Sequence, residues 1–228
     1  MTDLEKSGDG RAIAIEMVSG AFAAILALPA GPAAPVIAGL AAPLIARGAE
    51  RVAAEWRRKT TVVADTALSV GVFIDPEAFC DALTSDSGMI ALTQKILFAA
   101  AVTGNDRKLR ALGAVLGRAA QDRRLDETNL LIDALAAIED PHVLVMGVLA
   151  REAPESRPGW LAQHVQAQVA LEPELVLAVL STLTRYGLAG TNRDNYGAVD
   201  QYMLTRFGHL VLDVMRQAAS AEGAGAER

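Results

Sequence analysis

The fold of the C-terminal third follows from the segment Pro173-Glu-Leu-Val-Leu-Ala-Val-Leu-Ser-Thr-Leu-Thr-Arg-Tyr186. Stepping along it at about 100° per residue predicts a helix with one apolar face. That face consists of Val176, Val179, Leu180, Leu183 and Tyr186. Gly187 comes next, and many helices end on a glycine with positive φ, so we expect this helix to end there.

Two short strands are expected after this helix, at Leu188–Asn192 and Val199–Leu204. The sequence Asn-Arg-Asp-Asn-Tyr-Gly between them is rich in residues that favour a reversal of the chain. The loop Ala153–Gly159 has room for a further short strand. Helices are expected around these strands at His142–Arg151, Trp160–Val169 and Phe207–Ala218.

A second sequence pattern spans the end of this helix and the two strands. It consists of Leu183, the pair Gly187-Leu188 and the string Tyr202-Met-Leu-Thr-Arg-Phe-Gly208. It resembles the MarR- and PadR-like winged helix-turn-helix superfamily. In that superfamily a leucine before a Gly-Leu pair begins the wing, and a Tyr-x-Leu-Thr-x-x-Gly string ends it. The resemblance implies that the third helix, Glu172–Tyr186, enters the DNA major groove while the wing touches phosphate or the minor groove.

The outward face of this helix is the candidate binding surface for DNA or for a partner protein. It carries one acid, one base and no Asn or Gln that could make bidentate base contacts. From Pro141 onward, seven Lys and Arg stand against nine Asp and Glu, a net charge of −2, whereas DNA binding relies on neutralising several phosphates. The candidate residues are Glu174, Leu177, Ala178, Ser181 and Arg185 on the helix, with Arg193 and Asn195 in the wing.

The composition is typical of packed helices, and the single cysteine is typical of a protein in a reducing compartment. Apolar residues make up 52% of the 228 residues and aromatic residues only 4%, so the core is built from Ala, Leu and Val. The net charge is −6, which gives no global attraction to nucleic acid. Cys80 is the single cysteine and is expected to be a small buried group. The acidic N-terminus does not resemble a secretion signal, so a cytoplasmic protein is expected.

Met17 to Ala46 carries no charged side chain, but four prolines interrupt it. We therefore expect an apolar helical hairpin over residues 12–59, with arms Arg11–Leu28 and Val36–Lys59 joined by a Pro29–Pro35 turn. One interpretation buries the hairpin in a helical bundle or an oligomer interface. The other places it at a membrane, with basic residues beside the lipid. The contact residues of either would be Gly20, Gly39, Ala42, Trp56, Arg57, Arg58 and Lys59.

Further helices are expected through residue 139. Asp75 and Pro76 open a short helix that ends at Leu83, and Ser85–Gly88 is expected to be a loop. Met89–Val102 is apolar on most faces and is expected to be the central core helix. The remaining helices are expected at Thr61–Val72, at Arg107–Ala120 with a solvated basic side that includes Lys108, and at Asp126–Glu139. The pattern from Ala27 to Leu149 resembles an uncharacterised bacterial helical family, which implies a fold and no chemistry.

The residues of the chain do not indicate catalysis. His142, His164 and His209 lie in separate expected helices, without the paired spacing of a metal site. The sequence contains no phosphate-binding loop and no nucleophile elbow. We therefore expect a protein that is not an enzyme and uses neither a cofactor nor a metal.

The expected fold is mostly α, a helical hairpin and bundle followed by a winged helix-turn-helix domain with a small β-wing. The expected boundaries are 1–139 for the helical domain, 140–218 for the winged helix and 219–228 for a flexible tail. Three hypotheses for function follow. The first is a DNA-binding regulator whose helical domain senses a signal or forms a homo-oligomer. The second is a protein-interaction module that does not bind DNA, and the third is an effector peripheral to a membrane that uses the hairpin.

Overall fold

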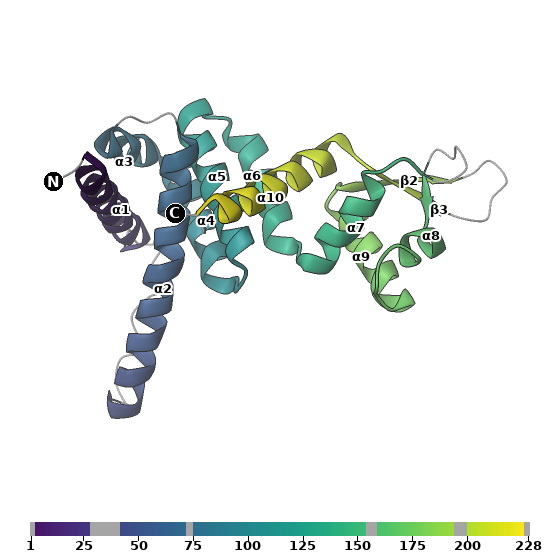
Figure 1. Ribbon diagram of the computed structural model, residues 1–228, viewed down its shortest axis with the longest axis horizontal. Coiled ribbons are helices and arrows are strands. Elements are labelled where there is room, and N and C mark those ends of the chain that lie inside the picture. Colours follow the sequence, from purple (N-terminus) through teal and green to yellow (C-terminus); the bar gives the residue numbers. More distant parts are fainter. Residues whose placement is uncertain (1–2, 28–41, 72–74, 154–158, 194–199, 226–228) are drawn as a thin grey trace. The chain divides into compact units, whose positions relative to one another are not determined.

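The computed structural model of the chain describes residues 3–27, 42–71, 75–153, 159–193 and 200–225 (Figure 1). It is mostly helical and contains one three-stranded antiparallel sheet near the C-terminus. The chain divides into two compact units, Met1–Ile132 (the N-terminal unit) and Asp133–Arg228 (the C-terminal unit). The division falls inside helix α6 (Leu125–Ala137), whereas the expected boundary followed this helix. Among the described residues, no helix is both long and apolar enough to cross a membrane.

The N-terminal unit is built from helices α1 to α5 and the first part of α6. Helix α1 buries a stripe formed by Val18, Phe22 and Ile25, while Gly20 is exposed. Aspartates cap the N-termini of α3 and α4. The side chain of Asp75 accepts a hydrogen bond from the backbone N–H of Glu77, and that of Asp86 accepts one from the N–H of Met89. The described helices that lie wholly in this unit span Asp3–Ala27 (α1), Ala42–Val70 (α2), Pro76–Thr84 (α3), Ser87–Val102 (α4) and Asp106–Asp122 (α5).

The described residues contain only part of the expected hairpin. Helix α1 begins at Asp3, earlier than expected, and the Pro29–Pro35 turn lies outside the described residues. The predicted break between Lys59 and Thr61 is wrong, since α2 runs without interruption from Ala42 to Val70. The sequence around residue 60 holds neither Pro nor Gly, so nothing there ends a helix. The expected loop at Ser85–Gly88 is also shorter, because α4 begins at Ser87.

Helix α5 is extensively buried, and α2 packs against it at very short range. A Cβ atom built on Gly113 would lie 2.6 Å from the carbonyl oxygen of Val63, and one on Gly117 would lie 2.5 Å from that of Ala67. The absence of a side chain therefore lets the two backbones touch. Lys108 is only 3% exposed, so the prediction that it lies on a solvated side is wrong.

The closeness of α2 and α5 predicts that Gly117→Ala destabilises the protein by at least about 2 kcal/mol, because the new methyl group meets the backbone of Ala67. Gly20→Ala is the matched control in the same unit. No atom lies within 4 Å of a Cβ at Gly20, and alanine favours a helix by about 0.5–1 kcal/mol over glycine. Denaturant unfolding of the full chain measures both. Equal effects of the two substitutions would contradict the backbone contact.

The C-terminal unit combines helices with the sheet. Strand β3 is central, in the order β1-β3-β2, and both of its pairings are antiparallel. Trp160 pairs with Tyr202, and Ala189 pairs with Leu204. The elements in chain order are α7 (Asp140–Leu149), β1 (Trp160–Leu161), α8 (Ala162–Gln166), α9 (Pro173–Arg185), β2 (Ala189–Arg193), β3 (Asp200–Leu204) and α10 (Arg206–Gly225).

Two boundaries in this unit differ from those expected. Trp160 lies in β1, not at the start of a helix, because its backbone pairs with Tyr202 and its indole Nε1 donates to the carbonyl of Arg151 at 3.2 Å. Helix α8 is correspondingly short. Helix α10 continues past Ala218 as far as Gly225, so the expected end of the helix at Ala218 is wrong.

Candidate functional site

Helix α9 has one buried face and one exposed face. Val176, Val179, Leu180 and Leu183 are each at most 2% exposed, because α9 packs on α7, α8 and β2. This confirms four of the five residues predicted for the core side, while Tyr186 is half-buried. All five outward residues predicted on the helix are exposed: Glu174, Leu177, Ala178, Ser181 and Arg185.

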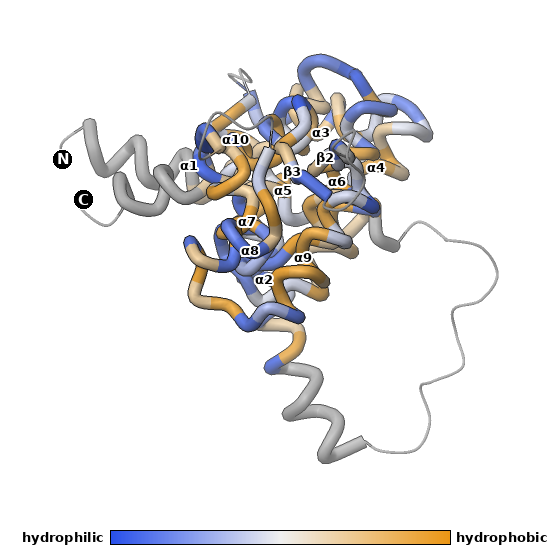
Figure 2. Tube along the Cα trace, turned by 90° about the vertical axis from the view of Figure 1, so that its right-hand side faces the viewer, coloured by the Kyte–Doolittle hydropathy of each residue, from blue (hydrophilic) through white to orange (hydrophobic). Residues whose placement is uncertain are grey.

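Leu175 adds to the exposed face and was not among the predicted residues. Leu175 is 43% exposed, and Leu177 is 53% exposed. The tube view coloured by hydropathy shows α9 as hydrophobic along much of its length (Figure 2). Leu175 lies at the border of the buried face on a helical projection, so periodicity alone does not assign it to either side. The N-terminal half of α9 therefore presents two leucines to solvent, beside the carboxylates of Glu172 and Glu174.

The C-terminal end of α9 carries the only base of the helix. The guanidinium carbon of Arg185 lies 5.1 Å from the centre of the Tyr186 ring, and Nη2 donates to the Tyr186 hydroxyl at 3.3 Å. Arg185 is exposed, so its remaining N–H groups face solvent or a partner. Arg193 ends strand β2, but its side chain lies outside the described residues, as does all of Asn195.

The corner after α9 is closed by two backbone hydrogen bonds. Gly187 has a φ of +69°, as predicted, and its N–H donates to the carbonyl of Thr184 at 3.0 Å. The N–H of Leu188 donates to the carbonyl of Leu183 at 2.8 Å. Together these bonds make the Schellman ending of a helix, which satisfies carbonyls that the helix would otherwise leave free.

Thr205 fixes this corner to the start of α10. Its hydroxyl accepts from the N–H of Gly208 at 2.9 Å, which caps the helix, and donates to the carbonyl of Gly187 at 2.7 Å. The N–H of Thr205 also donates to the carbonyl of Leu188 at 3.0 Å. That carbonyl lies directly against the position where Gly208 would carry a Cβ. The threonine and the last glycine of the Tyr-x-Leu-Thr-x-x-Gly string are therefore needed for this local geometry.

This link predicts that Thr205→Val destabilises the protein by about 1–2 kcal/mol, because the substitution removes the cap and the bond to Gly187 but keeps the side-chain shape. Thr205→Ser retains the hydroxyl and should lose less than half as much. Chemical unfolding of the full chain compares the two variants. If serine and valine were equally destabilising, the methyl group would be the important part of the side chain and the hydroxyl would not.

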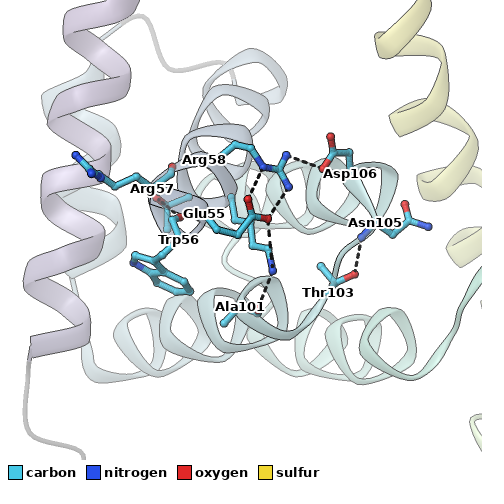
Figure 3. Close-up of polar contacts among 10 residues, drawn as sticks. Glu55, Trp56, Arg57, Arg58, Ala101, Thr103, Asn105 and Asp106 are labelled. Carbon is cyan, nitrogen blue, oxygen red and sulfur yellow. Dashed lines mark hydrogen bonds and ion pairs between the residues drawn. The ribbon is translucent and has the colours of Figure 1, made fainter. Parts of the chain in front are cut away.

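The basic cluster proposed as a membrane or oligomer contact is largely engaged within the N-terminal unit (Figure 3). Arg58 lies between two acids, 2.9 Å from Glu55 and 2.8 Å from Asp106. Its hydrogen bond lowers the pKa of the Glu55 carboxyl below its usual value. Lys59 is buried and donates from Nζ to the carbonyl of Ala101 at 2.8 Å, at the end of α4. Arg57 stays exposed.

The other proposed contact residues have different surroundings. Trp56 is half-buried, and Gly20 is exposed on α1 with open space beside it. Ala42 begins α2, but its side chain lies outside the described residues, as does all of Gly39. The structure therefore joins Trp56, Arg57, Arg58 and Lys59 in consecutive positions of α2, while Ala42 begins the same helix and Gly20 lies on α1.

The position of Lys59 predicts that Lys59→Met destabilises the protein by about 1–2 kcal/mol, because the end of α4 loses a charged donor. Arg57→Met is the matched control, since Arg57 is exposed and its Nε donates to the carbonyl of Ala53, in its own helix, at 3.3 Å. A change of no more than about 0.5 kcal/mol is expected for the control. Thermal unfolding at one pH measures both. A loss confined to Arg57→Met would show that the assignment of Lys59 is wrong.

The C-terminal unit also contains an open pocket of about 470 Å³. Its lining includes Arg151, Glu152, Trp160, Met203 and His209. The described lining offers no Ser, Thr or Cys that a histidine could activate as a nucleophile. Its described lining residues therefore form a concave polar surface.

His142 and the cysteine have ordinary structural surroundings. Nδ1 of His142 accepts from the backbone N–H of Glu139 at 3.0 Å, so this ring caps α7. Cys80 is half-buried, and burial raises the pKa of its thiol. Across the described ranges, no three His, Cys, Asp or Glu side chains gather in a way that could hold a metal ion.

Comparison with known proteins finds no match to this chain. The chain matches no protein-family model, no curated protein and no solved structure.

Proposed function

We propose that the chain is a non-enzymatic interaction protein whose C-terminal unit is a winged helix that docks a protein through the exposed face of α9. The order of elements supports the winged helix, because a helix, a strand and two helices precede a β-hairpin whose second strand is central in the sheet. The resemblance of the Gly187-Leu188 and Tyr202–Gly208 strings to the MarR- and PadR-like superfamily supports the same assignment.

One observation carries the choice of a protein as the partner. The first half of α9 contains Leu175 and Leu177, each about half exposed. Leu175 and Leu177 are two residues apart, so they lie on opposite flanks of the outward face, where a partner surface that covers this face meets one leucine on each side. Fully burying a leucine contributes about 1.5–3 kcal/mol, so covering the exposed half of each contributes about half as much. A protein surface supplies that cover, whereas the edges of DNA bases and phosphates do not.

A DNA-binding regulator is the competing proposal, and it rests on the order of elements. In helix-turn-helix proteins the N-terminal residues of the third helix contact base edges. Here those positions hold Glu172 and Glu174, whose carboxylates repel phosphate. Arg185, the only base of α9, lies at the opposite end and stacks on Tyr186. The charge distribution along α9 therefore supports protein binding over base recognition.

The proposal predicts that Leu177→Asp abolishes capture of a protein partner from a lysate of the source organism, while a folded circular dichroism spectrum is retained. Leu210→Asp is the matched control, since Leu210 is exposed to a similar extent (46%) on α10. Fluorescence anisotropy with a pool of random DNA duplexes should give no binding at moderate salt. DNA binding in the micromolar range or tighter that is lost in Arg185→Ala would overturn the proposal in favour of the regulator.

A further inference from the structure

The exposed face of α9 has the residue spacing of a helix that pairs with another helix. Glu174, Ala178, Ser181 and Arg185 follow one another at alternating steps of four, three and four residues. This is the a/d spacing of a two-helix seam, in which the stripe runs straight along the helix. All four side chains are exposed, and they lie opposite the face that packs in the unit.

This stripe is complementary to itself when it is turned end to end. A two-fold axis midway between Ala178 and Ser181 brings Ala178 of one copy against Ser181 of the second copy. The same axis brings Glu174 of each copy against Arg185 of the other, so both ends of the seam pair an acid with a base. A stripe with this symmetry meets the requirement of a closed isologous interface, in which the same patch serves both subunits.

The middle of the stripe allows the two helices to come close. Ala178 and Ser181 are small, and the distance between packed helix axes, about 8–10 Å, depends on the side chains at the contact. The flanking threonines add no unsatisfied hydroxyl, because Thr182 donates to the carbonyl of Ala178 at 3.0 Å and Thr184 to that of Leu180 at 2.9 Å. Leu177 flanks the seam and would be covered by the second helix.

We infer that the partner of the α9 face is a second copy of this chain, joined through an antiparallel α9 pair with a Glu174–Arg185 ion pair at each end. The inference rests on the proposed protein-docking role of α9 and names the partner. Charge complementarity selects this occupant, because a chain with the same stripe supplies a base opposite Glu174 and an acid opposite Arg185 at the same time. The contact is small, so a dimer of modest affinity is expected.

A charge exchange on the full chain tests the inference. Sedimentation over a concentration series should show a monomer–dimer equilibrium for the wild type. Glu174→Arg and Arg185→Glu each place like charges at both ends, which should raise the dissociation constant at least about tenfold. The doubly exchanged variant restores both pairs and should dimerise like the wild type. An equimolar mixture of the two single variants should form a mixed dimer. Glu152→Arg, an exposed charge change outside α9, is the control.

The outcomes separate this inference from the proposed function. A wild type that stays monomeric, or a dimer that both Glu174→Arg and Arg185→Glu leave unchanged, would overturn the self-pairing of α9. If Leu177→Asp still abolished capture of another protein in that case, the proposed docking role would stand with a different partner. DNA binding that depends on Arg185 would overturn the docking role itself.

Discussion

The geometry of the C-terminal unit depends on one backbone carbonyl, that of Leu188. It accepts from the N–H of Thr205, it lies against Gly208, and it directly follows the glycine that ends α9. The end of α9, the first residue of the hairpin region and the start of α10 therefore meet at a single point. Because α9 ends at this point, the corner fixes its C-terminal end, while packing on α7, α8 and β2 holds its buried face.

The two sides of α9 have different roles. Residues on one side pack in the core, and residues on the other side are exposed to a partner. The buried side is purely aliphatic, and the exposed side alternates carboxylate, small and basic residues with two leucines. Substitutions on the exposed side therefore leave the core intact, which makes a binding surface on this helix free to change without loss of the fold. The acidic N-terminal end of α9 also places negative charge where the helix dipole is positive, a stabilising arrangement that is unsuited to phosphate.

Sequence periodicity predicted α9 well and α5 poorly, for physical reasons that differ between the two helices. The core face of α9 is set by its own pattern of Val and Leu, so Val176 to Leu183 were assigned correctly. The burial of α5 depends on Gly113 and Gly117 meeting the backbone of α2, and a helical projection carries no information about a distant backbone. Trp160 was misplaced for a similar reason, because its strand exists only through pairing with Tyr202. The exposure of Leu175 at the rim of the buried face was likewise not decided by periodicity.

The two glycines of α5 have a consequence for how the N-terminal unit folds. They are one helical turn apart, and each faces a carbonyl of α2 that is also one turn from the other. Sliding α5 by a single residue would place Ala114 or Arg118 where no side chain fits. A partly collapsed chain with the wrong register would therefore be unable to close this contact. The glycines act as a check on register during folding, which widens the energy gap between the native arrangement and its nearest competitors.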